Sequence, residues 1–137
     1  MTDNSNLGFA ELLGAALAAR RSAHAPYSGF KVGAALRAAS GRTYVGCNVE
    51  NVSFGLTICA ERAAVVAAIA GDEREFEALV VVADVPQPVM PCGACRQVLA
   101  EFSERLAIRC ANLTGEVVDV TLDELLPHRF DAGRCST

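Results

Sequence analysis

The pattern of apolar and polar residues divides the first part of the chain into a helix and a hairpin. Residues 7–21 place apolar side chains at the three- and four-residue spacing of an amphipathic helix. A loop with proline and glycine follows, and residues 30–36 and 43–49 then have the composition of strands. Because turn residues at 39–42 separate these strands, we expect them to form a hairpin.

The middle of the chain predicts two further helices on either side of a buried strand. The first runs from about Cys59 to Ala70 and ends at Gly71. Residues 79–83 form a short continuous apolar run, which is typical of a strand covered on both faces. Three prolines between residues 86 and 91 keep the next segment irregular, and a helix from about Gly93 to Phe102 follows.

The last part of the chain predicts two strands and a short helix. Residues 107–111 and 117–120 can pair around the turn between them, and Thr121 to Glu124 form a capping box that opens a helix ended by Pro127. The resulting order, α-β-β-α-β-α-β-β-α, predicts an α/β fold with a mixed sheet flanked by helices. Neither a repeat nor a linker divides the sequence, so residues 1–137 are expected to form one domain.

Length, charge and hydropathy restrict the class of protein. A chain of 137 residues suits a single core, and its apolar content of 52%, much of it alanine and valine, suits tight packing or a buried subunit interface. The net charge of −4 argues against a nucleic-acid partner, which needs a basic surface. No apolar run approaches the ~20 residues of a membrane span, so no membrane partner is expected.

Cysteine usage and the N-terminal sequence indicate the compartment. Residues 1–6 are polar and lack the basic and apolar blocks of a secretory signal. In a chain without such a signal, six cysteines are more often metal ligands or reactive groups than disulfide partners. We therefore expect a cytoplasmic protein.

Two short motifs together predict a metal centre: Cys59-Ala-Glu61 and Pro91-Cys-Gly-Ala-Cys95. Cys92 and Cys95 are three residues apart at a predicted helix start, so both sulfurs can contact one ion. Cys59 also stands at a predicted helix start, where unpaired N–H groups and the helix dipole stabilise a thiolate. Two helix ends that meet across one buried strand would bring the three thiolates together.

The number of ligands bears on what the metal does. Three protein ligands leave one tetrahedral position of Zn²⁺ open for water, which distinguishes a catalytic site from a structural one. Spacing alone leaves Cys47, Cys110 and Cys135 open as a fourth ligand, although buried or tail thiols are their simpler interpretation. The sequence therefore predicts Zn²⁺ as the cofactor.

Glu61 and Arg62 follow Cys59 closely enough to act at the same centre. At a helix end, Glu61 can reach the water while Cys59 reaches the metal, which makes Glu61 the candidate proton carrier. Taken alone, a first-turn glutamate is better explained by the helix dipole. Arg62 is placed to donate hydrogen bonds to a ligand sulfur and so to tune the metal, with an ordinary surface arginine as the alternative.

Four stretches of the sequence resemble the small, homotetrameric, zinc-dependent cytidine deaminases. They are Pro26–Ala35, Gly46–Arg62, Met90–Leu99 and Leu125–Pro127, and together they span essentially the whole chain. The resemblance implies a three-layer α/β/α fold around a five-stranded mixed sheet. It also implies the hydrolytic deamination of free cytidine and deoxycytidine to uridine and deoxyuridine, with release of ammonia, in pyrimidine salvage.

The resemblance further implies roles that spacing does not assign. Phe30 would pack against the pyrimidine ring, and Asn48 and Glu50 would bind the ribose hydroxyls. Ala60 would donate its backbone N–H to the pyrimidine carbonyl. Phe130 would lie over the site of a neighbouring subunit, so the homotetramer would be part of catalysis.

Elementary chemistry agrees with a nucleoside substrate. The carboxylate of Glu50 can accept two hydroxyl hydrogen bonds and would repel a phosphate, which favours a free nucleoside over a nucleotide. Glu61 would take a proton from the activated water that attacks C4 and pass protons to N3 and to the leaving amino group. Phe54 departs from the family pattern, because many relatives have a tyrosine there.

Three other functions stay open on sequence grounds. A different zinc deaminase, such as one acting on blasticidin S, is opposed by the stretch Asn48–Asn51, which resembles a ribose-binding motif. A polynucleotide deaminase is opposed by the acidic balance and the short chain. A non-enzymatic zinc module would need four protein ligands.

Overall fold

The fold, taken from a computed structural model that describes residues 8–132, has the predicted order of elements with one added 3-10 turn, η2. The elements are α1 (Phe9–Arg20), β1 (Val32–Ala38), β2 (Thr43–Cys47), η2 (Phe54–Leu56), α2 (Ala60–Ala70), β3 (Phe76–Ala83), α3 (Gly93–Ala100), β4 (Ala107–Ala111), β5 (Val117–Thr121) and α4 (Leu122–Leu125).

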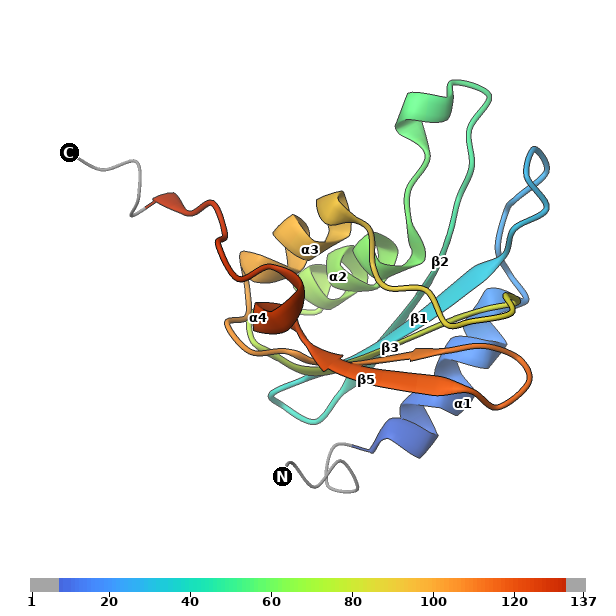
Figure 1. Cartoon of the computed structure of the whole chain (residues 1–137). Coiled ribbons are helices and arrows are strands. Elements are labelled where there is room, and N and C mark those ends of the chain that lie inside the picture. The colour runs from blue at the N-terminus through green and yellow to red at the C-terminus, as the bar shows by residue number, and fades with distance from the viewer. Residues whose placement is uncertain (1–7, 133–137) are drawn as a thin grey trace.

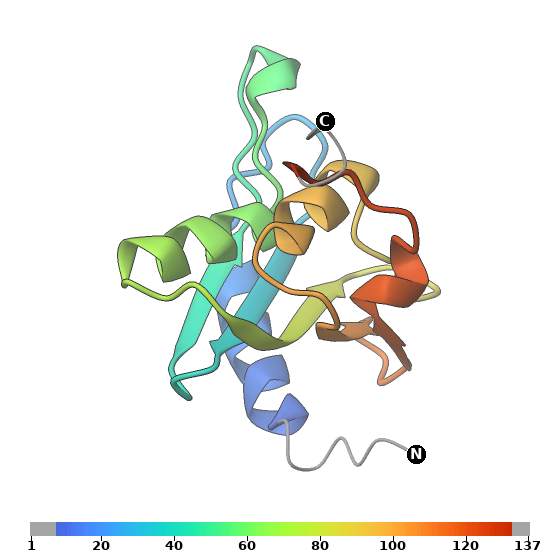
Figure 2. The same cartoon turned by 90° about the vertical axis from the view of Figure 1, so that its left-hand side faces the viewer.

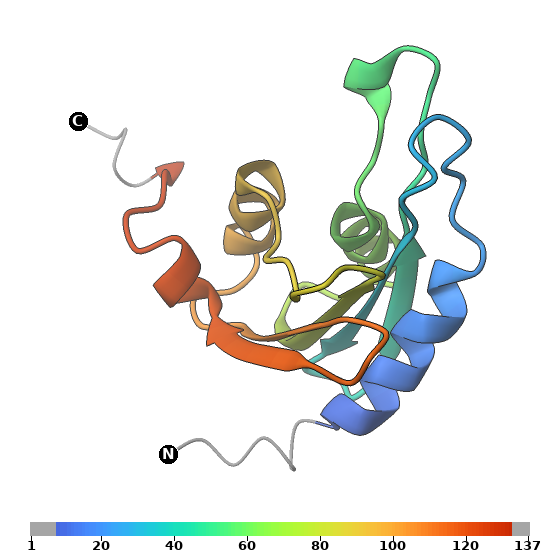
Figure 3. The same cartoon turned by 45° about the vertical axis from the view of Figure 1, so that its right-hand side comes forward.

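The five strands form one mixed sheet in the order β2-β1-β3-β4-β5. β3 and β4 run parallel, joined by the crossover through α3, and the other three neighbouring pairs are antiparallel. α1 lies against one face of the sheet, whereas α2 and α3 lie against the other (Figures 1 and 3). These observations confirm the expected three-layer α/β/α fold around a five-stranded mixed sheet.

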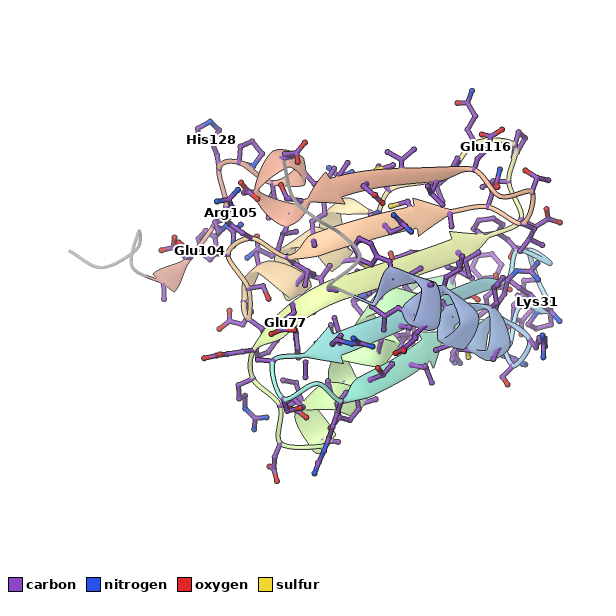
Figure 4. The ribbon with its side chains drawn as sticks, turned by 90° about the horizontal axis from the view of Figure 1, so that it is seen from below. Lys31, Glu77, Glu104, Arg105, Glu116 and His128 are labelled. Carbon is purple, nitrogen blue, oxygen red and sulfur yellow. The ribbon has the colours of Figure 1, made fainter. Side chains whose placement is uncertain are left out.

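The central strand β3 shows why both faces need a helix layer. Leu79 and Val81 pack with α2 and α3, and Val80 and Val82 pack with α1. Successive side chains of a strand point to opposite faces, so a continuous apolar run requires cover on both. Figure 4 shows α1 lying across the face of the sheet opposite α2 and α3.

β1 extends to Ala38 rather than Leu36, whereas at the other end of the hairpin it starts at Val32 rather than Phe30 and β2 ends at Cys47 rather than Val49. The reason is the side chain of Asn48, which replaces part of the ladder. Its Oδ1 accepts a hydrogen bond from the N–H of Val32 at 2.9 Å, and its Nδ2 donates to the carbonyl of Phe30 at 2.7 Å. The side-chain amide thereby frees the backbone around Phe30 from the sheet.

α2 lies close against β2 because Gly46 has no side chain. A Cβ at residue 46 would lie 2.4 Å from the carbonyl oxygen of Ala60 and 2.4 Å from the amide nitrogen of Ala64. Both atoms belong to the backbone, so the first turn of α2 would have to move. The position of that turn, which follows Cys59 and includes Glu61, therefore depends on glycine at position 46.

We predict that Gly46→Ala lowers the free energy of unfolding by about 1–3 kcal/mol or more, the usual cost of overpacking a core. Gly14→Ala is the matched control, because Gly14 is exposed in α1 and an added Cβ there meets nothing within 4 Å. Alanine should stabilise that helix by up to ~1 kcal/mol. Urea unfolding measures both effects, and a Gly46→Ala variant as stable as the wild type would contradict the close approach.

Candidate metal centre and active site

The N-terminal ends of α2 and α3 meet and bring three sulfurs together. Cys59 immediately precedes α2, and Cys92 immediately precedes α3. Cys95 lies in the first turn of α3 and is fully buried. The Sγ atoms of the three cysteines all lie within 4.8 Å of one another. The structure thus has the convergence of two helix ends that the sequence predicted.

The chemistry and spacing of these sulfurs fit Zn²⁺. A tetrahedral ion with Zn–S bonds of about 2.3 Å separates its sulfur ligands by about 3.8 Å, which small side-chain adjustments can reach from the observed spacing. Thiolates are ligands that zinc prefers. Within residues 8–132, neither Cys47 nor Cys110 joins the cluster, and the Sγ of Cys110 lies 3.8 Å from the sulfur of Met90 instead. Cys135 is outside the described residues.

Hydrogen bonds among the thiols leave one sulfur ionised before any metal binds. The bond from the Cys95 thiol, followed by that from Arg62, lowers the pKa of Cys59 to about 5. The same bond with Cys59, together with burial, raises the pKa of Cys95. The cluster therefore presents a thiolate to an incoming cation at neutral pH, and metal binding would release the remaining thiol protons.

Arg62 contacts a candidate ligand, as its position in the sequence suggested. Its Nη2 lies 3.4 Å from the Sγ of Cys59 and donates to it. This contact raises the pKa of Arg62, so the guanidinium stays charged. Its Nε is buried and has no hydrogen-bond partner among the residues that the structure describes. The guanidinium is thus directed at the sulfur cluster rather than at solvent.

Glu61 is a buried carboxyl beside the same cluster, with 6% of its surface exposed. Burial is the main cause that raises its pKa, and the negative charge of Cys59 adds to the effect. A carboxyl with a raised pKa exchanges protons closer to neutral pH than an exposed one does. This environment is the one that a proton carrier needs.

A cavity of about 270 Å³ opens beside the cluster, close to the lower end of the ~300–1,000 Å³ range of small-ligand sites. The candidate residues in its walls are Phe30, Asn48, Glu50, Cys59, Ala60, Glu61 and Cys92. Cys95 is fully buried and does not line the cavity. Phe130 does not line this cavity; it is 69% exposed, and its carbonyl accepts a hydrogen bond from Gln97 at 3.0 Å.

Glu50 is held in place by the turn that precedes β1. Its Oε1 accepts hydrogen bonds from the N–H groups of Tyr27 at 3.0 Å and Ser28 at 3.1 Å, and its Oε2 accepts one from the hydroxyl of Ser28. The hydroxyl of Ser28 is the main cause that lowers the pKa of Glu50, so the carboxylate is ionised at neutral pH. Sequence reasoning missed Ser28, although a serine in a Tyr-Ser-Gly turn was the available signal.

The apolar wall of the cavity was also missed. It is formed by Val32, Val81, Val89 and Met90. Val89 and Met90 belong to the irregular proline-containing segment just before Cys92, and no periodic pattern marks their orientation. A flat heteroaromatic ring could lie against such a wall while its polar edge faces Glu61.

The sequence matches a protein-family model and known proteins over most of its length. Residues 10–115 match the family model for the cytidine and deoxycytidylate deaminase zinc-binding region. A cytidine deaminase of Sporosarcina psychrophila is 50% identical over 113 residues, which cover 82% of this chain and 83% of that protein. A cytidine deaminase of Halalkalibacterium halodurans is 47% identical over 122 residues, which cover 88% and 92%.

Solved structures agree with the sequence comparison. The crystal structure of cytidine deaminase from Burkholderia pseudomallei is 45% identical, with a TM-score of 0.85 over 95% of this chain and 100% of that one. The crystal structure of cytidine deaminase from Mycobacterium tuberculosis is 42% identical, with a TM-score of 0.79 over 90% and 98%. By family model, sequence and fold, this chain belongs to the cytidine and deoxycytidylate deaminase zinc-binding family.

Proposed function

We propose that this protein is an enzyme, a zinc-dependent hydrolase that deaminates cytidine to uridine with release of ammonia. One observation carries the proposal: the three-cysteine cluster and the buried carboxyl of Glu61 lie beside the same small cavity. Relatives that are 47–50% identical over more than four fifths of the chain are named cytidine deaminases. The site and the family therefore point to the same reaction.

In this proposal, Cys59, Cys92 and Cys95 hold the zinc ion. A bound Zn²⁺ supplies Lewis acidity, which makes water a nucleophile near neutral pH. Because the negative charge of three thiolates is larger than the positive charge of the ion, the site needs positive charge from its surroundings. The N-terminal ends of α2 and α3 provide part of it, and Arg62 provides the rest through its bond to Cys59.

Glu61 is the proposed catalytic acid and base. It takes a proton from the attacking water and delivers it to N3 of the pyrimidine as C4 becomes tetrahedral. It then carries the proton of the hydroxyl now on C4 to the amino group, so that the C4–N bond breaks, ammonia leaves and the C4 carbonyl of uridine forms. One carboxyl can perform these steps because burial raises its pKa and because it shares a cavity wall with Cys59 and Cys92.

The remaining walls of the cavity are proposed to bind the nucleoside. Phe30 packs against the pyrimidine ring, and the backbone N–H of Ala60, which as the first residue of α2 has no intrahelical partner, donates to the pyrimidine carbonyl. Asn48 and Glu50 bind the sugar hydroxyls. An ionised Glu50 repels a phosphate, so the substrate is a free nucleoside, and we propose that cytidine and deoxycytidine are both accepted, as pyrimidine salvage requires.

A homotetramer is supported by an exposed apolar arm, residues 49–58, that protrudes from the body of the protein (Figures 1 and 2). Its exposed apolar side chains are Val49, Val52, Phe54, Leu56 and Ile58. An arm of this kind is typical of subunit contacts. Phe130, which is exposed on its own subunit, would then cover the cavity of a neighbour. The ring of Phe54, in the arm, packs edge-on against that of Tyr27, with ring centroids 5.6 Å apart.

A cytoplasmic location is proposed because the cluster requires reduced sulfur. The five cysteines that the structure describes are all free. Disulfides form in oxidising compartments, where a three-thiol site would be at risk of oxidation. Among the described residues, no helix combines the length and the apolar character that crossing a membrane takes.

The competing functions have less support. A blasticidin-S deaminase of Bacillus cereus is 27% identical over 107 residues, compared with 50% over 113 residues for the cytidine deaminase of Sporosarcina psychrophila. The net charge of −4, with Glu50 and Glu61 in the cavity walls, opposes a polynucleotide substrate. A structural zinc module would need a fourth ligand, and within residues 8–132 no further His, Cys, Asp or Glu joins the cluster.

The direct test is ammonia release from cytidine, deoxycytidine, cytidine 5′-monophosphate, blasticidin S and single-stranded DNA. We expect turnover of the first two, loss of that turnover with a zinc chelator, and recovery when Zn²⁺ is added back. The monophosphate should have at least about tenfold lower kcat/KM because of repulsion by Glu50. Turnover of blasticidin S or DNA in preference to cytidine would contradict the proposal that cytidine is the substrate.

Two neighbouring substitutions should separate proton transfer from metal binding. Glu61→Gln should keep the fold and the zinc and lose at least ~10²–10⁴-fold in kcat, because an amide cannot carry the proton.

Arg62→Ala should bind zinc about tenfold or more weakly and should move the acid limb of the pH–rate profile to higher pH, because it removes a positive charge beside Cys59.

Chelator competition and steady-state kinetics on both variants make the comparison. Arg62→Lys is the matched control, since it keeps the charge without the planar donor group. An active Glu61→Gln enzyme would remove Glu61 from the mechanism. An Arg62→Ala enzyme with unchanged zinc retention and pH profile would end the tuning hypothesis.

A further inference from the structure

Arg96 makes two strong hydrogen bonds beside the metal centre that the proposed mechanism does not use. It follows Cys95 in α3 and is partly buried. Its Nε donates to the carbonyl of Pro91 at 2.7 Å, and its Nη1 donates to the carbonyl of Leu125 at 2.9 Å. The guanidinium thereby joins the segment before Cys92 to the end of α4.

The two acceptors are carbonyls that regular secondary structure does not satisfy. Pro91 is fully buried and lies just before the start of α3, where the side chain of Cys92 makes no capping hydrogen bond. Leu125 is the last residue of α4, and the final carbonyls of a helix lack partners within it. The planar fork of arginine can serve two such acceptors at once, and the bonds are charge-assisted.

The position of Pro91 matters because its two neighbours both belong to the site. Met90 lines the cavity, and Cys92 is a candidate metal ligand. A shift of the Pro91 carbonyl would therefore move the cavity wall and a ligand sulfur together. Segment 84–92 has no regular secondary structure of its own to prevent such a shift.

α4 provides the other end of the connection and is well anchored. Thr121 and Glu124 form a capping box at its start, in which Oε1 of Glu124 accepts from the N–H of Thr121 at 3.1 Å and from its hydroxyl at 2.8 Å. Leu122 is fully buried in the core between the sheet and the helices. Arg96 thus ties an irregular, ligand-bearing segment to an element whose place is set by the core.

We propose that Arg96 is a positioning residue, which holds the segment Met90–Cys92 in the geometry that metal and substrate binding require. The inference rests on the proposed function for its substrate, although its effect on metal binding does not. Arg96 acts through the Pro91 carbonyl and is neither a cavity-lining residue nor a member of the sulfur cluster. A lysine could reach one of the two carbonyls but could not join both.

Two control variants separate this role from ordinary structural effects. Arg105→Ala removes another arginine that contacts α4: Arg105, in the segment between α3 and β4, pairs with Asp123 at 3.7 Å but lies on the surface with 78% of its side chain exposed (Figure 4). Ile108→Val trims a fully buried residue of β4 and lowers overall stability while leaving Arg96 and its two acceptor carbonyls in the chain.

The experiment uses the full chain loaded with Zn²⁺, or with Co²⁺ as a spectroscopic probe, in the variants Arg96→Ala, Arg96→Lys, Arg105→Ala and Ile108→Val. Zinc release to a colorimetric chelator, the cobalt absorption spectrum, the thermal midpoint, kcat and KM are measured. Arg96→Ala should release zinc about tenfold faster, change the cobalt–thiolate bands and raise KM, with Arg96→Lys intermediate. The two controls should keep wild-type zinc release and cobalt spectra.

An Arg96→Ala protein with wild-type zinc release and cobalt bands would overturn the proposal. So would equally fast release from Ile108→Val at the same thermal midpoint, since the effect would then follow from lost stability alone. If Arg96→Ala does not fold, Arg96→Lys decides on the same two readouts. Because neither readout needs turnover, the result stays independent of whether the wild type deaminates cytidine.

Discussion

The meeting of two helix N-termini at three sulfur atoms is the constraint on which this structure depends. A helix start concentrates unpaired N–H groups and partial positive charge, and two of them face one place here. Cys59 and Cys92 each occupy the position just before a helix, so their sulfurs reach forward from the helix ends. The sheet beneath, with helices on both faces, sets the distance between those ends.

Charge balance then explains the other groups at the centre. Thiolates placed together repel one another unless a cation and nearby donors compensate. The helix ends and Arg62 supply donors, and the thiol of Cys95 together with Arg62 lowers the pKa of Cys59 before metal binds. Glu61 experiences the opposite influence, because burial and the nearby thiolate raise its pKa. One site thus keeps a sulfur ionised and makes a carboxyl able to hold a proton.

Much of the fold and the metal ligands could be predicted from sequence because they follow local rules. Period and turn chemistry identified the elements, and the apolar run at 79–83 identified the strand that needs cover on both faces. Ser28, Met90 and Arg96 could not be identified in the same way, since their roles depend on tertiary structure: Ser28 contacts Glu50, Met90 lines the cavity and Arg96 contacts Leu125. The hairpin ends were misplaced for the same reason: a side-chain amide, that of Asn48, replaces backbone pairing there.

The most direct test of this account is X-ray absorption spectroscopy at the zinc edge on the metal-loaded protein. A catalytic site with three cysteine ligands should give three sulfur ligands at about 2.3 Å and one oxygen ligand at about 2.0 Å that a substrate-like inhibitor displaces or perturbs. A first shell of four sulfurs, or one that includes a histidine nitrogen, would contradict it. In that case the two helix ends would form a closed structural site, and the reaction would have to take place elsewhere.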